Sequence, residues 1–136
     1  ELRSYDYYLG VIALDKGRSD EAIAHFKEAL AHLPPSSGLN LYEDCLGNAY
    51  LALGQTDGAL KEYRRILAFN PNYPLLHYHM AQAFERKGEQ QLARDEYSRF
   101  LDLWKQADSD IPEVIDARRK LDQSDPALHA AAKHPG

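Results

Sequence analysis

The chain has 136 residues, a formal net charge of −5 and one cysteine, Cys45. This length suits one domain with one continuous core. The negative charge argues against direct binding to nucleic acid, the single cysteine excludes an internal disulfide, and no stretch approaches the ~20 apolar residues of a membrane span. We therefore expect a cytoplasmic protein that does not enter a membrane, although these features leave the periplasm open.

Apolar residues that recur three or four positions apart predict amphipathic helices along most of the chain. The expected helices cover, in order, about residues 2–16, 19–32, 39–53, 56–69, 74–87, 89–105 and 111–122. Residues 123–136 carry no apolar stripe, so we expect a flexible tail. Polar residues ahead of the stripes predict helix caps: Ser19 or Asp20, Thr56 or Asp57, and Asp110 with Glu113 as a capping box.

Three copies of one pattern recur along these predicted helices. Each copy has a glycine at the end of its first helix, a small residue seven positions earlier, an alanine five positions later and an aromatic residue nine positions later. The copies are Gly10, Gly17, Ala22 and Phe26; Gly47, Gly54, Ala59 and Tyr63; and Ala81, Gly88, Ala93 and Tyr97. Small residues let two helices approach closely, and a glycine supplies the left-handed backbone that ends a helix. The chain is therefore predicted to be a repeat array.

The pattern is clearest in Leu46-Gly47-Asn48-Ala49-Tyr50, and it resembles the tetratricopeptide repeat (TPR), a helix–turn–helix unit of about 34 residues. The resemblance implies an all-α fold, a right-handed α-solenoid or TPR superhelix of about seven antiparallel helices. A single domain over 1–122 would hold repeats at about 3–36, 40–73 and 74–107 and a capping helix at 111–122, ahead of the tail at 123–136. The chain departs from the consensus where tryptophan is expected early in each repeat, because these positions hold Asp6, Glu43 and His77.

The first helix of each TPR lines a concave face, which the resemblance implies binds a peptide or a partner helix. Asn48 faces away from the structural residues around it, and Asp44 lies one turn before it. Tyr8 and Cys45 share the same face, with Cys45 expected to pack between helices. The candidate partner-binding residues are Tyr7, Val11, Asp44, Asn48, Tyr78, His79, Gln82 and Arg86.

The sequence contains no nucleophile–base pair, phosphate-binding loop or converging metal-ligand set. We therefore expect no enzyme activity, no cofactor and no metal, and the leading hypothesis is a protein–protein interaction module. The alternative is a structural or self-association module, a weak homo-oligomer through terminal repeats, with Tyr5, Tyr8 or Leu9 exposed. Residues 100–113 are also similar to the last repeat of long bacterial signalling proteins, which implies a scaffold or sensor part of a larger bacterial protein.

Overall fold

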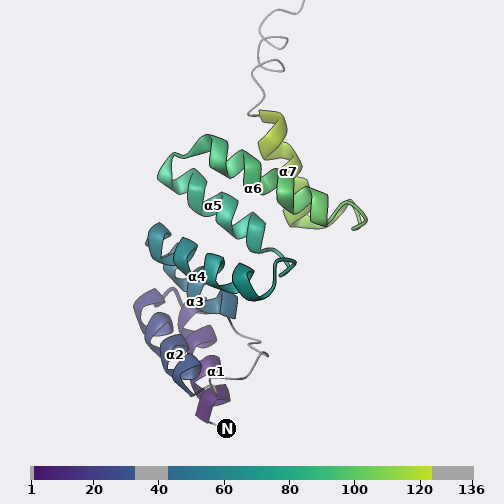
Figure 1. Cartoon of the computed structure of the whole chain (residues 1–136). Helices are drawn as coiled ribbons and strands as arrows, with labels where there is room; N and C mark the ends of the chain where they lie inside the picture. Colours follow the sequence, from purple (N-terminus) through teal and green to yellow (C-terminus); the bar gives the residue numbers. More distant parts are fainter. Residues whose placement is uncertain (1, 33–42, 124–136) are drawn as a thin grey trace, which may run out of the picture. The chain divides into compact units, whose positions relative to one another are not determined.

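The computed structural model describes residues 2–32 and 43–123 (Figure 1). Within them the chain forms seven α-helices and no strand. The segment between the helices predicted at 19–32 and 39–53, the start of the second of these helices and the predicted tail beyond residue 123 lie outside the described residues.

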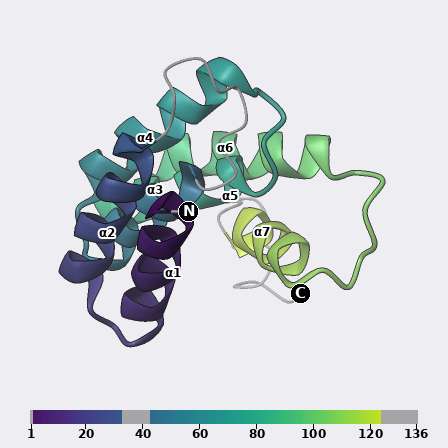
Figure 2. The ribbon, with the colours of Figure 1, turned by 90° about the horizontal axis from the view of Figure 1, so that it is seen from below.

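The chain divides into two compact units, residues 1–71 and 72–136, called here the N-terminal and C-terminal units. The N-terminal unit contains α1 (Leu2–Asp15), α2 (Ser19–Ala31), α3 (Glu43–Ala52) and α4 (Thr56–Phe69). The C-terminal unit contains α5 (Leu76–Lys87), α6 (Gln90–Leu103) and α7 (Pro112–Gln123). Helices α1 and α2, α3 and α4, and α5 and α6 pack as pairs (Figure 1, Figure 2). The paired helices predicted from the spacing are therefore present.

The same turn joins the two helices of every pair. Gly17, Gly54 and Gly88 have φ angles of 71°, 82° and 78°, in the left-handed region. In the first turn the Arg18 N–H donates to Ala13 O and the Gly17 N–H to Leu14 O, and the other two turns repeat both bonds. This is the Schellman motif, which satisfies carbonyl groups at the end of a helix.

The predicted side-chain caps are wrong by one residue. Ser19 and Thr56 are the first residues of α2 and α4, and the N-cap positions hold Arg18 and Gln55, which make no side-chain cap hydrogen bond. The Schellman turn is so short that the residue after each glycine already occupies the N-cap position. The acidic residues Asp20 and Asp57 lie instead in the first helical turn, where a negative charge favours the helix dipole.

Two predicted helix starts also shift. Helix α5 begins at Leu76 rather than at Pro74, because Leu75 has φ = 62°, a left-handed conformation that cannot continue a right-handed helix. Helix α7 begins at Pro112, and its first backbone bond runs from the Ile115 N–H to Ile111 O. The residue before the helix is therefore Ile111 and not Asp110, the cap predicted from the sequence.

In the first two pairs, an aromatic residue on the second helix fills the space left by a glycine on the first. A Cβ atom added at Gly10 would lie 2.5 Å from the Phe26 ring, and one added at Gly47 would lie 2.5 Å from the Tyr63 ring. In the N-terminal unit, α1, α2 and α3 share one apolar cluster: Ala13, Ala22, Ile23, Phe26, Leu46 and Ala49. In the C-terminal unit, the buried residues include Tyr97, Phe100, Val114 and Ala117.

Candidate functional site

The predicted partner-binding residues fall into two groups. Tyr7 and Val11 lie on α1, and Asp44 and Asn48 lie on α3, all within the N-terminal unit. The second group lies on one helix of the C-terminal unit, α5: Tyr78, His79, Gln82 and Arg86.

Tyr7 of α1 contacts residues of both α2 and α3. Its ring centre lies 6.1 Å from that of Phe26, and its hydroxyl lies 3.9 Å from the thiol of Cys45. Tyr7 is half-buried, whereas Tyr8 is 63% exposed. The Tyr8 ring meets the Tyr7 ring edge-on, with 5.5 Å between the ring centres. The accessible aromatic side chain of α1 on this face is therefore Tyr8, with Tyr7 behind it.

Asn48 has a structural partner. The hydroxyl of Tyr63, a fully buried residue of α4, donates a hydrogen bond of 2.6 Å to Asn48 Oδ1. The corresponding pair of the first repeat, Val11 and Phe26, has no polar atom in its side chains. The tyrosine hydroxyl and its acceptor therefore occur together, as expected when a buried polar group needs a hydrogen bond. The side-chain oxygen of Asn48 is committed to this contact.

Asp44 and Cys45 lie side by side at the start of α3. The Cys45 thiol is 3.8 Å from Asp44 Oδ1. Burial and the charge of Asp44 raise the pKa of Cys45 to about 11. Cys45 is therefore a neutral thiol near pH 7, and not a nucleophile.

Tyr78 faces α7. Only 8% of this residue is exposed, and its hydroxyl donates a 2.7 Å hydrogen bond to Asp116 Oδ2. Burial and that hydrogen bond raise the pKa of Tyr78. Its ring also contacts those of Tyr97 and Phe100 in the core of the unit. A partner could reach Tyr78 only if α7 moved away.

His79, Gln82 and Arg86 form the remainder of the α5 group. His79 Nδ1 lies 3.3 Å from Gln82 Oε1, and both residues are half-buried. Arg86 is exposed near the end of α5.

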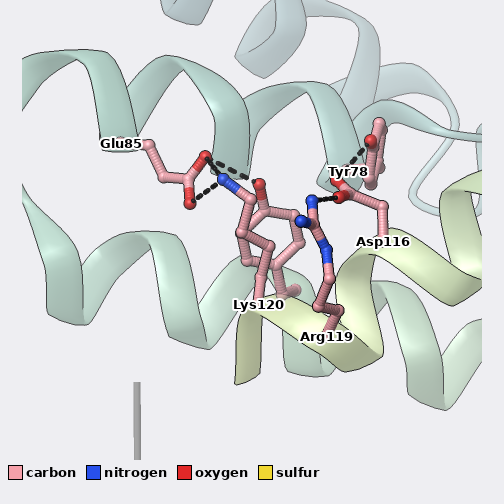
Figure 3. A network of polar contacts seen from close by, with 6 residues as sticks. Tyr78, Glu85, Asp116, Arg119 and Lys120 are labelled. Atoms are coloured by element: carbon pink, nitrogen blue, oxygen red, sulfur yellow. Dashed lines mark hydrogen bonds and ion pairs between the residues drawn. The ribbon is translucent and has the colours of Figure 1, made fainter. Parts of the chain in front are cut away.

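Sequence reasoning missed a polar network that joins α5 to α7 (Figure 3). Lys120 Nζ donates to both oxygens of Glu85, at 2.9 and 3.0 Å, and the Tyr97 hydroxyl donates to Glu85 Oε2 at 3.0 Å. A signal was present in the repeat alignment, because the position of Glu85 holds Leu14 and Leu51 in the first two repeats. An acid at an otherwise apolar position indicates a charged partner nearby.

The consensus tryptophan positions hold matched acid–histidine pairs in two repeats. Oδ1 of Asp6 on α1 lies 3.5 Å from Nδ1 of His25 on α2. Nδ1 of His77 on α5 lies 2.6 Å from Oε2 of Glu96 on α6. These are equivalent positions with acid and histidine exchanged between the helices. In the described part of the chain, no group of three histidine, cysteine or acidic side chains converges as a metal site would require.

Two sequence profiles of one family match the chain. One, described as "Tetratricopeptide repeat", matches residues 7–36, and the other, "TPR repeat", matches residues 47–88. Together they cover more than half of the chain. The chain belongs to the tetratricopeptide repeat family. The helices of the described residues agree with the all-α architecture of this family. The chain is a helical-repeat module for protein interaction.

The solved structure of the Sgt2 TPR domain from Aspergillus fumigatus is similar to this chain, with a TM-score of 0.72 at 17% identity. The match covers 98% of this chain and 83% of that domain. It supports the all-α solenoid class predicted from the sequence.

Three curated relatives are similar in sequence. The TPR and J domain-containing co-chaperone DNJ1 of Fusarium oxysporum is 27% identical over 84 residues, and ycf37, an uncharacterised protein of Guillardia theta, is 36% identical over 98 residues. The photosystem I assembly protein Ycf3 of a Synechococcus strain is 29% identical over 112 residues. The matches cover 62%, 70% and 76% of this chain but 16%, 54% and 65% of the relatives. Among the described helices of this chain, none is long and apolar enough to cross a membrane.

Proposed function

We propose that the chain binds a peptide or a helix of a partner protein on the face that α1 and α3 form in the N-terminal unit. This binding face consists of Tyr7, Tyr8, Val11, Asp44 and Asn48. The exposure of Tyr8 carries the proposal. A large aromatic side chain that is 63% exposed and backed by a second tyrosine is a suitable anchor for a ligand. His79, Gln82 and Arg86 of α5 are proposed as a separate set of partner contacts within the C-terminal unit.

The chemistry of the binding face favours a particular kind of ligand. Asp44 of the binding face and Asp15, which lies one helical turn after Val11 on α1, are both acidic. Tyrosine rings accept apolar side chains on their faces and also attract lysine or arginine. The preferred ligand is therefore a segment with an apolar side chain next to a basic one.

The wider role is also a proposal. The similarity of residues 100–113 to bacterial signalling proteins supports a scaffold or sensor part of a larger bacterial protein in the cytoplasm. Two relatives are named as a co-chaperone and as an assembly protein, which agrees with a role in handling other proteins. No catalytic step, cofactor, nucleic acid or membrane enters the proposal.

A peptide-display selection against the whole chain tests the binding face. The selected peptides are then measured by calorimetry against Tyr8→Ala, Asp44→Asn and a control, Phe69→Ala, which removes an aromatic side chain that is 79% exposed on α4. We expect a loss of about tenfold or more in affinity for Tyr8→Ala and no change for the control. Equal affinities for both alanine variants would place the site elsewhere. Asn48→Ala and Tyr78→Ala are poor probes, because both also break hydrogen bonds within the protein.

The alternative is self-association through α1. Tyr5 and Tyr8 are each 63% exposed, and Ile12 is 46% exposed one turn further on, so these residues form an apolar stripe. Leu9 is half-buried and contributes less. Sedimentation over a wide concentration range separates the two functions. A monomer throughout would remove this alternative, whereas a dimer lost in Tyr5→Ser would favour it over peptide binding.

A further inference from the structure

Helix α7 covers part of α5 through paired polar contacts. Asp116 of α7 accepts a hydrogen bond from Tyr78, and Lys120, one turn later, forms an ion pair with Glu85 (Figure 3). On α6, Arg94 donates a 3.2 Å hydrogen bond to the backbone oxygen of Leu121. Polar side chains and one backbone carbonyl thus fix the position and direction of α7.

Two apolar residues of α7 are fully buried. They are Val114 and Ala117, one turn apart, while Ile115 is 51% exposed. Helix α7 has 12 residues, and an isolated helix of that length is marginal in water. Its helical form therefore depends on its contacts with α5 and α6.

We propose that the surface of α5 and α6 beneath α7, called here the α7 site, is a second protein-binding surface, and that α7 is its built-in competitor. The ligand is an amphipathic helix of a partner protein with the pattern of α7. It carries two small apolar residues three positions apart, a carboxylate just before the second of them, and a lysine four positions after the carboxylate. The carboxylate accepts from Tyr78 and the lysine pairs with Glu85. This proposal does not depend on the binding face of α1 and α3.

Competition follows from the tether between α6 and α7. Only residues 104–111 separate the two helices, and a short linker holds a tethered segment at an effective concentration of the order of millimolar. A partner helix must therefore bind more tightly than α7 itself, and its apparent affinity falls by the fraction of chains whose site is open. A second copy of the chain offers only the same α7 and gains no contact by exchange, so a partner with a better-fitting helix is the expected occupant.

The probe is a fluorescent synthetic peptide of residues 110–123, measured by anisotropy against the full chain. Ala117→Glu places a charge at a fully buried contact of α7 and should release it, while the α5 and α6 surfaces stay unchanged. We expect this variant to bind the peptide at least about tenfold more tightly than the wild type does. Adding Glu85→Lys to the variant should abolish the gain, and a peptide with Lys120→Glu should restore it.

Several outcomes would overturn the proposal. They are equal binding to wild type and Ala117→Glu, no binding to an Ala117→Glu chain that keeps its other helices by circular dichroism, and binding that ignores the charge reversal. A wild-type dimer that becomes monomeric in Ala117→Glu would identify a second copy as the occupant and also contradict it. If Ala117→Glu fails to fold, Asp116→Ala with Lys120→Ala removes the two side-chain contacts with α5 and leaves the apolar contacts and the Arg94–Leu121 hydrogen bond. That variant should show a smaller gain than the one expected for Ala117→Glu, but still a gain over wild type.

Discussion

Replacing Gly47 by alanine tests the helix packing of the N-terminal unit. The new Cβ atom would lie 2.5 Å from Cε1 and 2.9 Å from Cδ1 of Tyr63, a ring with no exposed surface. The ring cannot shift freely, because its hydroxyl is bonded to Asn48 at 2.6 Å. The substitution therefore forces the two helices or the ring to move.

Two opposing effects set the size of the change. Alanine in a helix interior is favoured over glycine by about 1 kcal/mol. Overpacking a filled core costs about 1–3 kcal/mol, and weakening the Tyr63–Asn48 bond adds about 1 kcal/mol. We expect a net loss of about 1–3 kcal/mol in the free energy of unfolding. The loss should stay in this range, because the third repeat has an alanine, Ala81, and a tyrosine, Tyr97, at the equivalent positions, and the Tyr97 hydroxyl bonds to Glu85 instead.

Urea unfolding followed by circular dichroism measures this loss. Gly58→Ala is the matched control, because its Cβ atom would lie 3.3 Å from the ring of Tyr50, which is itself only half-buried. We expect Gly58→Ala not to lower the free energy of unfolding, because the same preference for alanine of about 1 kcal/mol applies and the half-buried Tyr50 ring can shift. The reasoning is refuted if Gly47→Ala is as stable as the wild type, or if the two variants lose equal stability.

Three further predictions follow from side-chain pairs and pKa values. Exchanging the partners in the double variant Asp6→His with His25→Asp should recover part of the stability lost in either single variant, measured by thermal unfolding, whereas additive losses would argue against a direct pair. Because its pKa is about 11, Cys45 should react with iodoacetamide at pH 8 on the order of 100-fold more slowly than a free cysteine, and a rate like that of the free amino acid would contradict the burial. Burial disfavours the charged form of Asp116, but hydrogen bonds from Arg119 and Tyr78 outweigh the burial and lower the pKa of Asp116. The charged carboxylate therefore stabilises the fold above its unfolded pKa of about 3.9, and this stabilisation is lost as the pH falls through the lower, folded pKa. Asp116→Asn should flatten that acidic part of the stability profile, and an unchanged profile would mean that the carboxylate is not engaged.

The repeat pattern could be predicted from the sequence because it depends on local backbone chemistry and on size. Gly17, Gly54 and Gly88 end helices wherever they occur, and Gly47 opposite Tyr63 follows from the close approach of two helices. The caps were wrong because Ser19 and Thr56 are good capping residues in general. Their failure here depends on a turn length that the sequence pattern does not show.

The direction of individual side chains was harder to predict. The sequence predicts that Asn48 faces a partner, and it does not reveal that the Asn48 oxygen also accepts a hydrogen bond from Tyr63, which lies on another helix. Tyr78 is a candidate partner-binding residue, yet it contacts α7, whose approach depends on the contacts of Asp116 and Lys120. Both cases depend on tertiary contacts that helical spacing within one segment cannot reveal.

The most direct test of the proposed binding face is backbone hydrogen exchange of the whole chain with and without a selected peptide. The account predicts slower exchange in α1 and α3, with little change in α2 and α4. A peptide bound at the α7 site would instead speed exchange in α7, because the displaced helix would lose its structure. Slower exchange confined to α2 and α4 would contradict the proposal that α1 and α3 form the binding face.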